Sequence, residues 1–123
     1  MRDKMNLLIV DDEKLVRWSI QESMGKDKFN VVSASDGTEA IEKIKQKHFD
    51  VIITDFVMPD CDGIEVAKKT MELQPSTKII MMTAYDSLLD KEEAKRAGVT
   101  TFINKPFQVN EVRSAVSKIL SKQ

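Results

Sequence analysis

Short apolar runs alternate with longer amphipathic stretches along this chain of 123 residues. The apolar runs occupy residues 7–10, 31–32, 51–54, 79–82 and 101–103. Several of these runs are continuously apolar, without the polar residue at every second position that marks a half-exposed strand. Continuous apolar runs are typical of a parallel sheet that helices cover on both faces. We therefore predict that the five runs are the strands of one buried parallel sheet.

The stretches between these runs have a helical pattern. Helices are expected over residues 14–24, from Thr38 onward, over 63–74, over 91–97 and over the last segment of the chain. Thr38 follows a Ser35-Asp36-Gly37 turn and is the expected cap of its helix. Gly25, Pro75 and Gly98 are the expected stop signals of three other helices. The apolar stripe of the last helix is formed by Val109, Val112, Val116 and Ile119. Trp18 is expected to pack against one side of the first helix.

Five strands that alternate with five helices predict an open α/β sheet. Right-handed crossovers place helices on both faces of such a sheet and bring the carboxyl ends of all strands to one edge. We expect a flavodoxin-like, five-stranded parallel sheet and adopt the strand order 2-1-3-4-5 by analogy with that fold. Ligands of these sheets bind at the carboxyl edge, close to the point where the strand order reverses.

Composition narrows the class of protein. A length of 123 residues fits one domain over residues 1–123, with enough buried surface to fold without a disulfide or a structural metal. The 19 basic and 20 acidic residues balance, which argues against a chain built to bind nucleic acid or an anionic membrane. Cys61 is the single cysteine, so no intrachain disulfide can form, and the first apolar run is too short to cross a membrane. We expect a soluble, cytoplasmic protein.

Polar side chains with complementary chemistry follow four of the five predicted strands. The first strand is followed by Asp11 and Asp12, the third ends near Asp55, the fourth ends near Thr83, and Lys105 follows the fifth. Each of these residues has an ordinary explanation when taken alone, such as a turn residue or an acidic helix start. Their joint arrival at one edge of the sheet is what predicts a functional site.

The chemistry of this set favours phosphoryl transfer at a metal ion. Three carboxylates without a cation would repel one another, and a site with only oxygen ligands favours Mg²⁺, with Mn²⁺ as a substitute. A carboxylate with an ordinary pKa of about 4 is ionised at pH 7, so Asp55 can act as a nucleophile without a general base. Thr83 can donate a hydrogen bond to a phosphoryl oxygen, and Lys105 can offset the charge of another.

These residues stand in segments that resemble the receiver domains of bacterial two-component response regulators. The matching segments are residues 8–13, 50–55, 58–63, 82–84 and 105–107, in the order of that family and over essentially the whole chain. The resemblance implies that Asp55 accepts the phosphoryl group and that Asp12, Asp55 and the backbone carbonyl of Val57 bind Mg²⁺. Asp11 is implied to act mainly through a metal-bound water. Thr83 and Lys105 would hold the phosphoryl group, and the Lys105–Pro106 peptide bond is expected to be cis.

The resemblance also implies a switch. Phosphorylation adds about −1.5 to −2 charges, and Phe102 is expected to rotate inward behind Thr83. The altered face would comprise the fourth helix, the fifth strand and the fifth helix. Such a domain is a signalling phosphoprotein rather than an enzyme, although it phosphorylates and dephosphorylates itself with Mg²⁺, at a rate that Val57 and Tyr85 are expected to tune. The implied partners are a sensor histidine kinase or a phosphotransfer protein, a downstream effector or fused output domain, and a second copy in a phosphorylation-dependent homodimer. Neither nucleic acid nor a membrane is an expected partner of the domain itself.

Three other functions share parts of this pattern. A phosphatase of the haloacid-dehalogenase type also uses a strand-tip Asp with Mg²⁺, but it carries a second Asp two residues later, where this chain has Val57. A flavodoxin-like electron carrier needs a phosphate-binding loop after the first strand, where Asp11 and Asp12 would repel a flavin phosphate. A scaffold that binds partners without phosphorylation stays open. The output of the domain also stays open, because residues 12–20 resemble receivers of sigma-54-dependent activators, whereas residues 82–85 and 105–107 resemble sporulation phosphorelay receivers.

Overall fold

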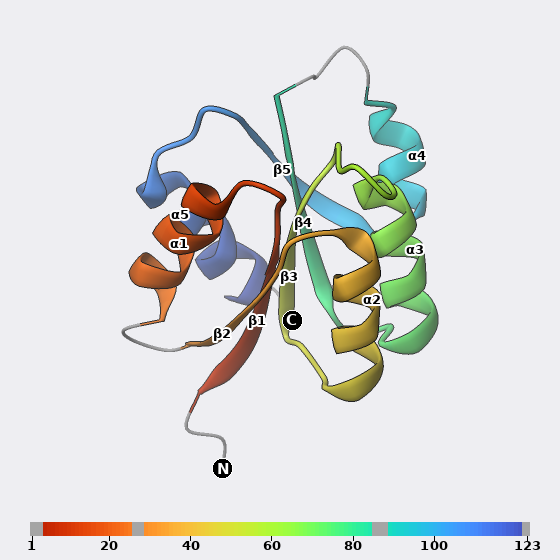
Figure 1. Cartoon of the computed structure of the whole chain (residues 1–123), viewed down its shortest axis with the longest axis horizontal. Coiled ribbons are helices and arrows are strands. Elements are labelled where there is room, and N and C mark those ends of the chain that lie inside the picture. Colours follow the sequence, from red (N-terminus) through yellow and green to blue (C-terminus); the bar gives the residue numbers. More distant parts are fainter. Residues whose placement is uncertain (1–3, 26–28, 85–88, 122–123) are drawn as a thin grey trace.

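The computed structural model describes residues 4–25, 29–84 and 89–121 (Figure 1). Strands and helices alternate along the chain. The strands are β1 Met5–Val10, β2 Phe29–Ala34, β3 Val51–Asp55, β4 Lys78–Thr83 and β5 Val99–Asn104. The helices are α1 Lys14–Met24, α2 Gly37–Gln46, α3 Gly63–Leu73, α4 Lys91–Arg96 and α5 Val109–Ser121. All strand pairs are parallel, in the order β2-β1-β3-β4-β5. This arrangement confirms the predicted fold class.

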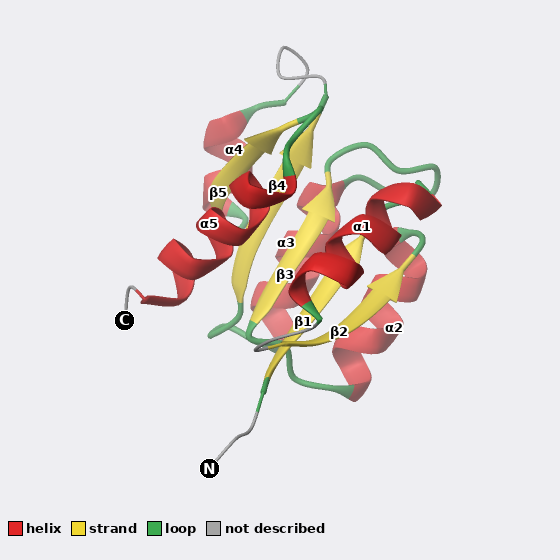
Figure 2. Cartoon of the chain, turned by 90° about the vertical axis from the view of Figure 1, so that its left-hand side faces the viewer, coloured by secondary structure: helices red, strands yellow, loops and turns green. Residues whose placement is uncertain are grey.

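The helices cover both faces of the sheet. Helices α1 and α5 pack together on one face, and α2, α3 and α4 lie side by side on the other (Figures 1 and 2). Strand β1 shows why its sequence is continuously apolar. Leu7 and Ile9 enter the core beneath α1 and α5, whereas Leu8 and Val10 enter the core beneath α2. All four side chains are fully buried, because each face of the central strands is covered by helices.

Two expectations for the helices prove wrong. Helix α2 is capped by Asp36 rather than Thr38, because the Asp36 carboxylate accepts a hydrogen bond of 2.8 Å from the Glu39 amide, three residues later. Trp18 is 58% exposed instead of packed. Helix α1 buries Ile20 and Met24, which follow one another at a spacing of four residues. Trp18, two residues before Ile20, therefore lies on another side of the helix.

Helices α1, α3 and α4 end within one residue of their predicted ends. Helix α1 ends at Met24, directly before Gly25, and α3 ends at Leu73, two residues before Pro75. Gly98 follows the end of α4 with a φ of 113°. A Cβ at Gly98 would also lie 2.4 Å from Met71 Cγ, so the turn into β5 requires glycine for both conformation and space. Within the described residues, no helix is long and apolar enough to span a bilayer.

Candidate functional site

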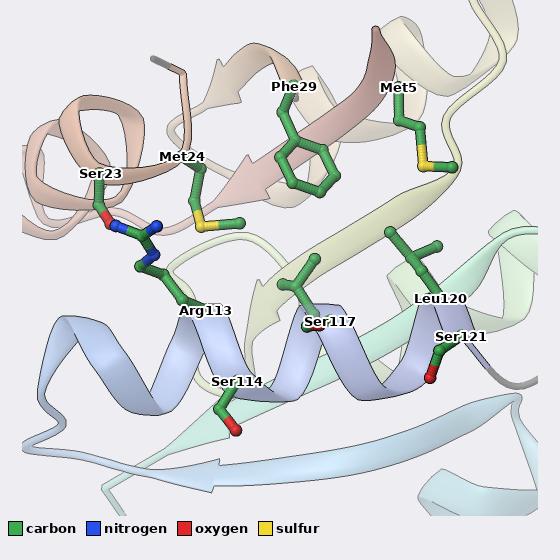
Figure 3. A pocket seen from close by; sticks show the side chains of 10 residues that line it. Met5, Ser23, Met24, Phe29, Arg113, Ser114, Ser117, Leu120 and Ser121 are labelled. Atoms are coloured by element: carbon green, nitrogen blue, oxygen red, sulfur yellow. The ribbon is translucent and has the colours of Figure 1, made fainter. Parts of the chain in front are cut away.

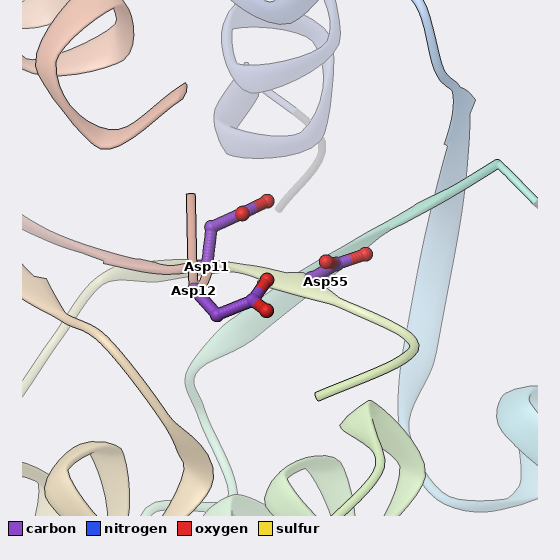
Figure 4. A group of neighbouring side chains, drawn as sticks. All are labelled: Asp11, Asp12 and Asp55. Carbon is purple, nitrogen blue, oxygen red and sulfur yellow. The ribbon is translucent and has the colours of Figure 1, made fainter. Parts of the chain in front are cut away.

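The sheet brings the predicted site residues together at its carboxyl edge. Asp11 and Asp12 follow β1, and Asp55 is the last residue of β3, the neighbouring strand. One carboxylate oxygen from each of these three residues lies within 4.8 Å of the other two, and Figure 4 shows the three side chains reaching into the same space. Thr83 ends β4 and Lys105 follows β5 at the same edge.

The loop between β1 and α1 is fixed by hydrogen bonds around Asp11. The Asp11 amide donates to Ala34 O at 3.1 Å, and the Asp11 carboxylate accepts from the Glu13 amide at 2.8 Å. The Arg17 guanidinium donates to the Asp11 carbonyl at 2.8 Å. Asp11 is fully buried, whereas Asp12 is exposed to solvent.

Lys105 is the cation at the centre of the acidic cluster. Its Nζ lies 2.8 Å from Asp11 Oδ2, 3.2 Å from Asp55 Oδ2 and 3.3 Å from Glu13 Oε1. The Lys105 amide also donates to Thr83 O at 2.9 Å, and the peptide bond that joins Lys105 to Pro106 is cis. The contact with Glu13 was not expected from the sequence, although Glu13 directly follows the acidic pair Asp11-Asp12.

Burial and neighbouring charges shift the pKa values of the ionisable residues in the site. Burial and the nearby negative charge of Asp11 raise the pKa of Asp55 to about 6, although Lys105 opposes the shift. Burial also raises the pKa of Asp11. For Lys105, burial alone would lower the pKa, but the hydrogen bond and charge of Asp11, together with the charge of Asp55, raise it above its ordinary value. The expected pKa of about 4 for Asp55 is therefore too low, yet the carboxylate is still mainly ionised at pH 7.

The donor set fits a hard divalent cation. The raised pKa values of Asp11 and Asp55 mean that one ammonium does not fully compensate their buried charges. All three clustered ligands are carboxylates, the ligand type that Mg²⁺ prefers, and the exposed Asp12 leaves a route from solvent. Val57 lies in the loop after Asp55 with a 45% exposed side chain, where the resemblance calls for a backbone carbonyl ligand.

The predicted switch residues lie on the two strands farthest from β2. Thr83 is 1% exposed at the end of β4, and Phe102 pairs with Met81 across β4 and β5. The Phe102 ring is partly buried in the core beneath α3 and α4, and Lys91 Nζ lies 5.5 Å from the ring centroid. Tyr85, the other residue expected near the site, lies outside the described residues.

A separate cavity of about 510 Å³ lies near the amino ends of β1 and β2, between α1 and α5 (Figure 3). Its lining includes Met24, Phe29, Arg113 and Leu120. None of the predicted site residues lines it. The chemistry of the chain is therefore concentrated at the opposite, carboxyl edge of the sheet.

Several known proteins resemble this chain in sequence and in fold. Residues 7–117 match the family model of the response regulator receiver domain. The chain is 33% identical over 114 residues to sporulation initiation phosphotransferase F of Bacillus subtilis, covering 93% of this chain and 92% of that protein. It is 36% identical over 114 residues to the chemotaxis protein CheY of Thermotoga maritima, covering 92% of this chain and 95% of that protein.

A longer relative and a solved structure show the same similarity. The transcriptional regulatory protein PhoP of Bacillus subtilis is 34% identical over 116 residues, which cover 94% of this chain but 48% of PhoP. The solved CheY-like receiver domain protein from Methanospirillum hungatei matches with a TM-score of 0.92 and 28% identity, over 97% of this chain and 95% of that one. The chain belongs to the receiver domain family of two-component response regulators, which are signalling phosphoproteins.

Proposed function

We propose that this domain accepts a phosphoryl group on Asp55 from a sensor histidine kinase or a phosphotransfer protein, in a reaction that requires Mg²⁺. The observation that carries the proposal is the Asp55 carboxylate at the tip of β3, with the Lys105 ammonium at 3.2 Å and oxygens of the Asp11 and Asp12 carboxylates within 4.8 Å. Asp11, Asp12, Asp55 and the Val57 carbonyl would hold the metal, and Mn²⁺ would serve in its place.

The residues of the chain supply the parts of a phosphoryl transfer. Asp55 is mainly ionised at pH 7, so an oxygen of its carboxylate attacks phosphorus without first losing a proton. The new O–P bond forms as the P–N bond of a phosphohistidine breaks, and the electron pair of that bond stays on the imidazole nitrogen. Mg²⁺, when bound, would offset the charge of the carboxylates and of the phosphoryl oxygens. The Thr83 hydroxyl and the Lys105 ammonium hold the transferred group on Asp55.

The surface beside the site fits a protein donor. A groove of about 580 Å³ opens next to Lys105, between α1 and the segment that leads into α5. Its lining is mainly apolar and includes Leu15, Val16, Pro106 and Phe107. On α1, Leu15 is 74% exposed and Trp18 is 58% exposed. Large apolar side chains that gather next to a charged reaction site favour a macromolecular partner over a small phosphate ester.

The output follows from the charge that the reaction adds. The new phosphoryl group draws Thr83 and Lys105 toward it, and Phe102 then turns inward behind Thr83. The changed surface consists of α4, β5 and α5, and it recruits an effector, a fused output domain or a second copy of the chain. The signal ends when the acyl phosphate is hydrolysed at the same site. All of these steps are expected in the cytoplasm.

Acetyl phosphate with Mg²⁺ tests the proposal. We expect an intact-mass adduct of one phosphoryl group that does not form when Mg²⁺ is chelated beforehand and is absent in Asp55→Asn. Asp36→Asn, which alters only a helix cap, should still form the adduct. Beryllofluoride, a phosphoryl mimic, should shift the amide NMR signals around Thr83 and Phe102. A folded protein that binds Mg²⁺ but forms no adduct would be a scaffold or, if it hydrolyses phosphomonoesters, a phosphatase.

A further inference from the structure

The loop that joins β3 to α3, residues 56–62, is tied to the start of α2 by one side chain. The Asp60 carboxylate accepts hydrogen bonds from the Gly37 amide at 3.1 Å, the Thr38 amide at 2.8 Å and the Thr38 hydroxyl at 2.6 Å. These donors, of which the Thr38 hydroxyl has the largest effect, lower the pKa of Asp60 to about 2. Asp60 is therefore ionised at any physiological pH and keeps all three contacts.

Cys61, the next residue, packs directly against Gly37 at the start of α2. A Cβ built on Gly37 would lie 1.9 Å from Cys61 Sγ, so the thiol occupies the space that any other residue at position 37 would fill. Cys61 also packs against the core beneath α2. Burial, with the negative charge of Asp60 next, raises the pKa of the Cys61 thiol to about 11, so little reactive thiolate is present at pH 7.

The same loop is fixed to the sheet at its first residue, and its two ends are bonded to each other. The Phe56 amide donates to Met82 O at 2.9 Å, and the Gly63 amide donates to Phe56 O at 2.8 Å. Between these ends lies Val57, whose carbonyl is a proposed metal ligand. Asp60 thus supplies a further attachment in the interior of the loop, to two residues of α2 that precede it by more than 20 positions.

Asp62 in the same loop shows what is different about Asp60. The Asp62 carboxylate accepts from the Glu65 amide at 3.0 Å and so caps α3, the helix that it directly precedes. Loss of such a local cap affects one helix end. Asp60, in contrast, joins two segments that are far apart in the sequence, so its loss removes the hydrogen bonds that tie the interior of the loop to the start of α2.

We infer that Asp60 is a positioning residue for the magnesium site: by tying the loop to Gly37 and Thr38, it holds the Val57 carbonyl where a cation bound by Asp12 and Asp55 can reach it. The inference rests on the proposed function. A backbone ligand has no side chain of its own to adjust, and its place is set by the loop alone. Residues that orient metal ligands contribute strongly to metal affinity.

The test compares two variants that each lose one exposed helix-capping carboxylate. Asp60→Ala removes the link to α2, and Asp90→Ala removes the cap of α4, which accepts from the Glu93 amide at 3.1 Å and has no part in the loop. Two quantities are measured in the whole chain, the Mg²⁺ dissociation constant by NMR titration and the rate at which iodoacetamide alkylates Cys61. We expect Asp60→Ala to weaken Mg²⁺ binding about ten-fold and to accelerate alkylation, in part because the charge of Asp60 no longer raises the pKa of Cys61, and Asp90→Ala to change neither.

A smaller change gives a graded result. Thr38→Val removes one of the three donors to Asp60 and keeps both amides, so it should move both quantities in the same direction by less. An Asp60→Ala protein that melts at a lower temperature but retains the Mg²⁺ affinity and the Cys61 rate of the wild type would overturn the inference and leave Asp60 a helix cap. Failure of the wild type itself to bind Mg²⁺ would instead refute the proposed function, together with the positioning role that depends on it.

Discussion

The ammonium of Lys105 lies 2.8 Å from the fully buried carboxylate of Asp11, and this pair sets the electrostatics of the whole site. The same Nζ contacts Asp55 Oδ2 at 3.2 Å. In the protein without metal, Lys105 therefore stands between two buried carboxylates whose charges repel one another. A cation that binds at Asp12 and Asp55 would also reduce this repulsion.

Replacement of Lys105 tests how much this contact contributes to stability. Lys105→Met leaves Asp11 buried without its ammonium partner, and we expect the free energy of unfolding in EDTA at pH 7 to fall by about 2–4 kcal/mol. Lys118→Met, at an exposed position of α5, is the matched control and should change it little. In a double-mutant cycle, Asp11→Asn should recover part of the loss. Additive effects of the two substitutions would show that the pair is not coupled.

The phosphoacceptor itself is expected to destabilise the protein without metal. Burial, with repulsion from Asp11 next, raises the pKa of Asp55 from 3.8 to about 6, so the folded state holds its proton more tightly than the unfolded state. Below about pH 4 both states are protonated and no penalty exists. The penalty develops between about pH 4 and about pH 6 and is complete above that range.

Asp55→Asn should remove this penalty. We expect the variant to be more stable than the wild type by about 1–3 kcal/mol at pH 7 in EDTA, measured by urea unfolding, with little difference between the two at pH 4. Added Mg²⁺ should narrow the gap, because it binds the folded wild type through Asp55. A variant less stable than the wild type at pH 7 would mean that Lys105 already compensates the Asp55 charge in full.

The sequence predicts the central strands β1 and β3 better than the edge strand β2. Residues 7–10 of β1 and 51–54 of β3 are buried on both faces, and their continuous apolar runs identify them directly. Strand β2 extends over six residues, but only 31–32 were predicted. As an edge strand it pairs with β1 alone and carries Asn30 and Ser33 at half-exposed or exposed positions, so its hydrophobic pattern is weak.

The site residues could be predicted from the sequence, whereas the contacts around them could not. Asp11, Asp12, Asp55, Thr83 and Lys105 each follow a recognisable strand, and parallel strands end at one edge. The contacts around them depend on how distant segments pack and leave no periodic signal. The bond from Thr38 to Asp60 spans 22 residues, so the sequence around Thr38 did not indicate that its hydroxyl contacts Asp60 and that Asp36 caps α2.

Gln74 is another residue whose role only the packed structure reveals. Its side-chain amide donates to Ile44 O and Lys47 O, each at 2.7 Å, and its carbonyl oxygen accepts from the Phe49 amide at 2.9 Å. The Thr77 hydroxyl lies 2.9 Å from the same oxygen and 2.7 Å from Phe49 O, so its single hydrogen is shared between these two acceptors. One 8% exposed side chain therefore joins the end of α2 to the segments before β3 and β4.

Gln74→Leu should be among the more destabilising single substitutions in the protein. It leaves three backbone groups, Phe49 N, Ile44 O and Lys47 O, without their partner, and we expect a loss of about 2–4 kcal/mol in the free energy of unfolding. Gln21→Leu, at an exposed position of α1, controls for the change of residue type. Equal urea midpoints for the two variants would show that water replaces the lost hydrogen bonds.

The resting position of Phe102 is tied to α4 by Lys91. The Lys91 ammonium lies 5.5 Å from the ring centroid, within the range in which a cation is attracted to an aromatic face. If Phe102 turns inward on activation, as proposed, this attraction is lost in the active state and favours the resting one. Removal of the charge should therefore shift the equilibrium toward the active state.

Lys91→Met keeps most of the side-chain volume and removes the charge, and we expect it to tighten beryllofluoride binding in the presence of Mg²⁺ about two- to five-fold. The affinity is measured by NMR titration, with the Phe102 signals as the reporter of ring position. Lys95→Met, one turn further along α4 and paired with Glu92 at 3.6 Å, is the matched control and should leave the affinity unchanged. The effect should also disappear in a Phe102→Leu background, because no aromatic face remains there. If Lys91→Met tightens binding equally in that background, Lys91 acts through the net charge of the surface and not through Phe102.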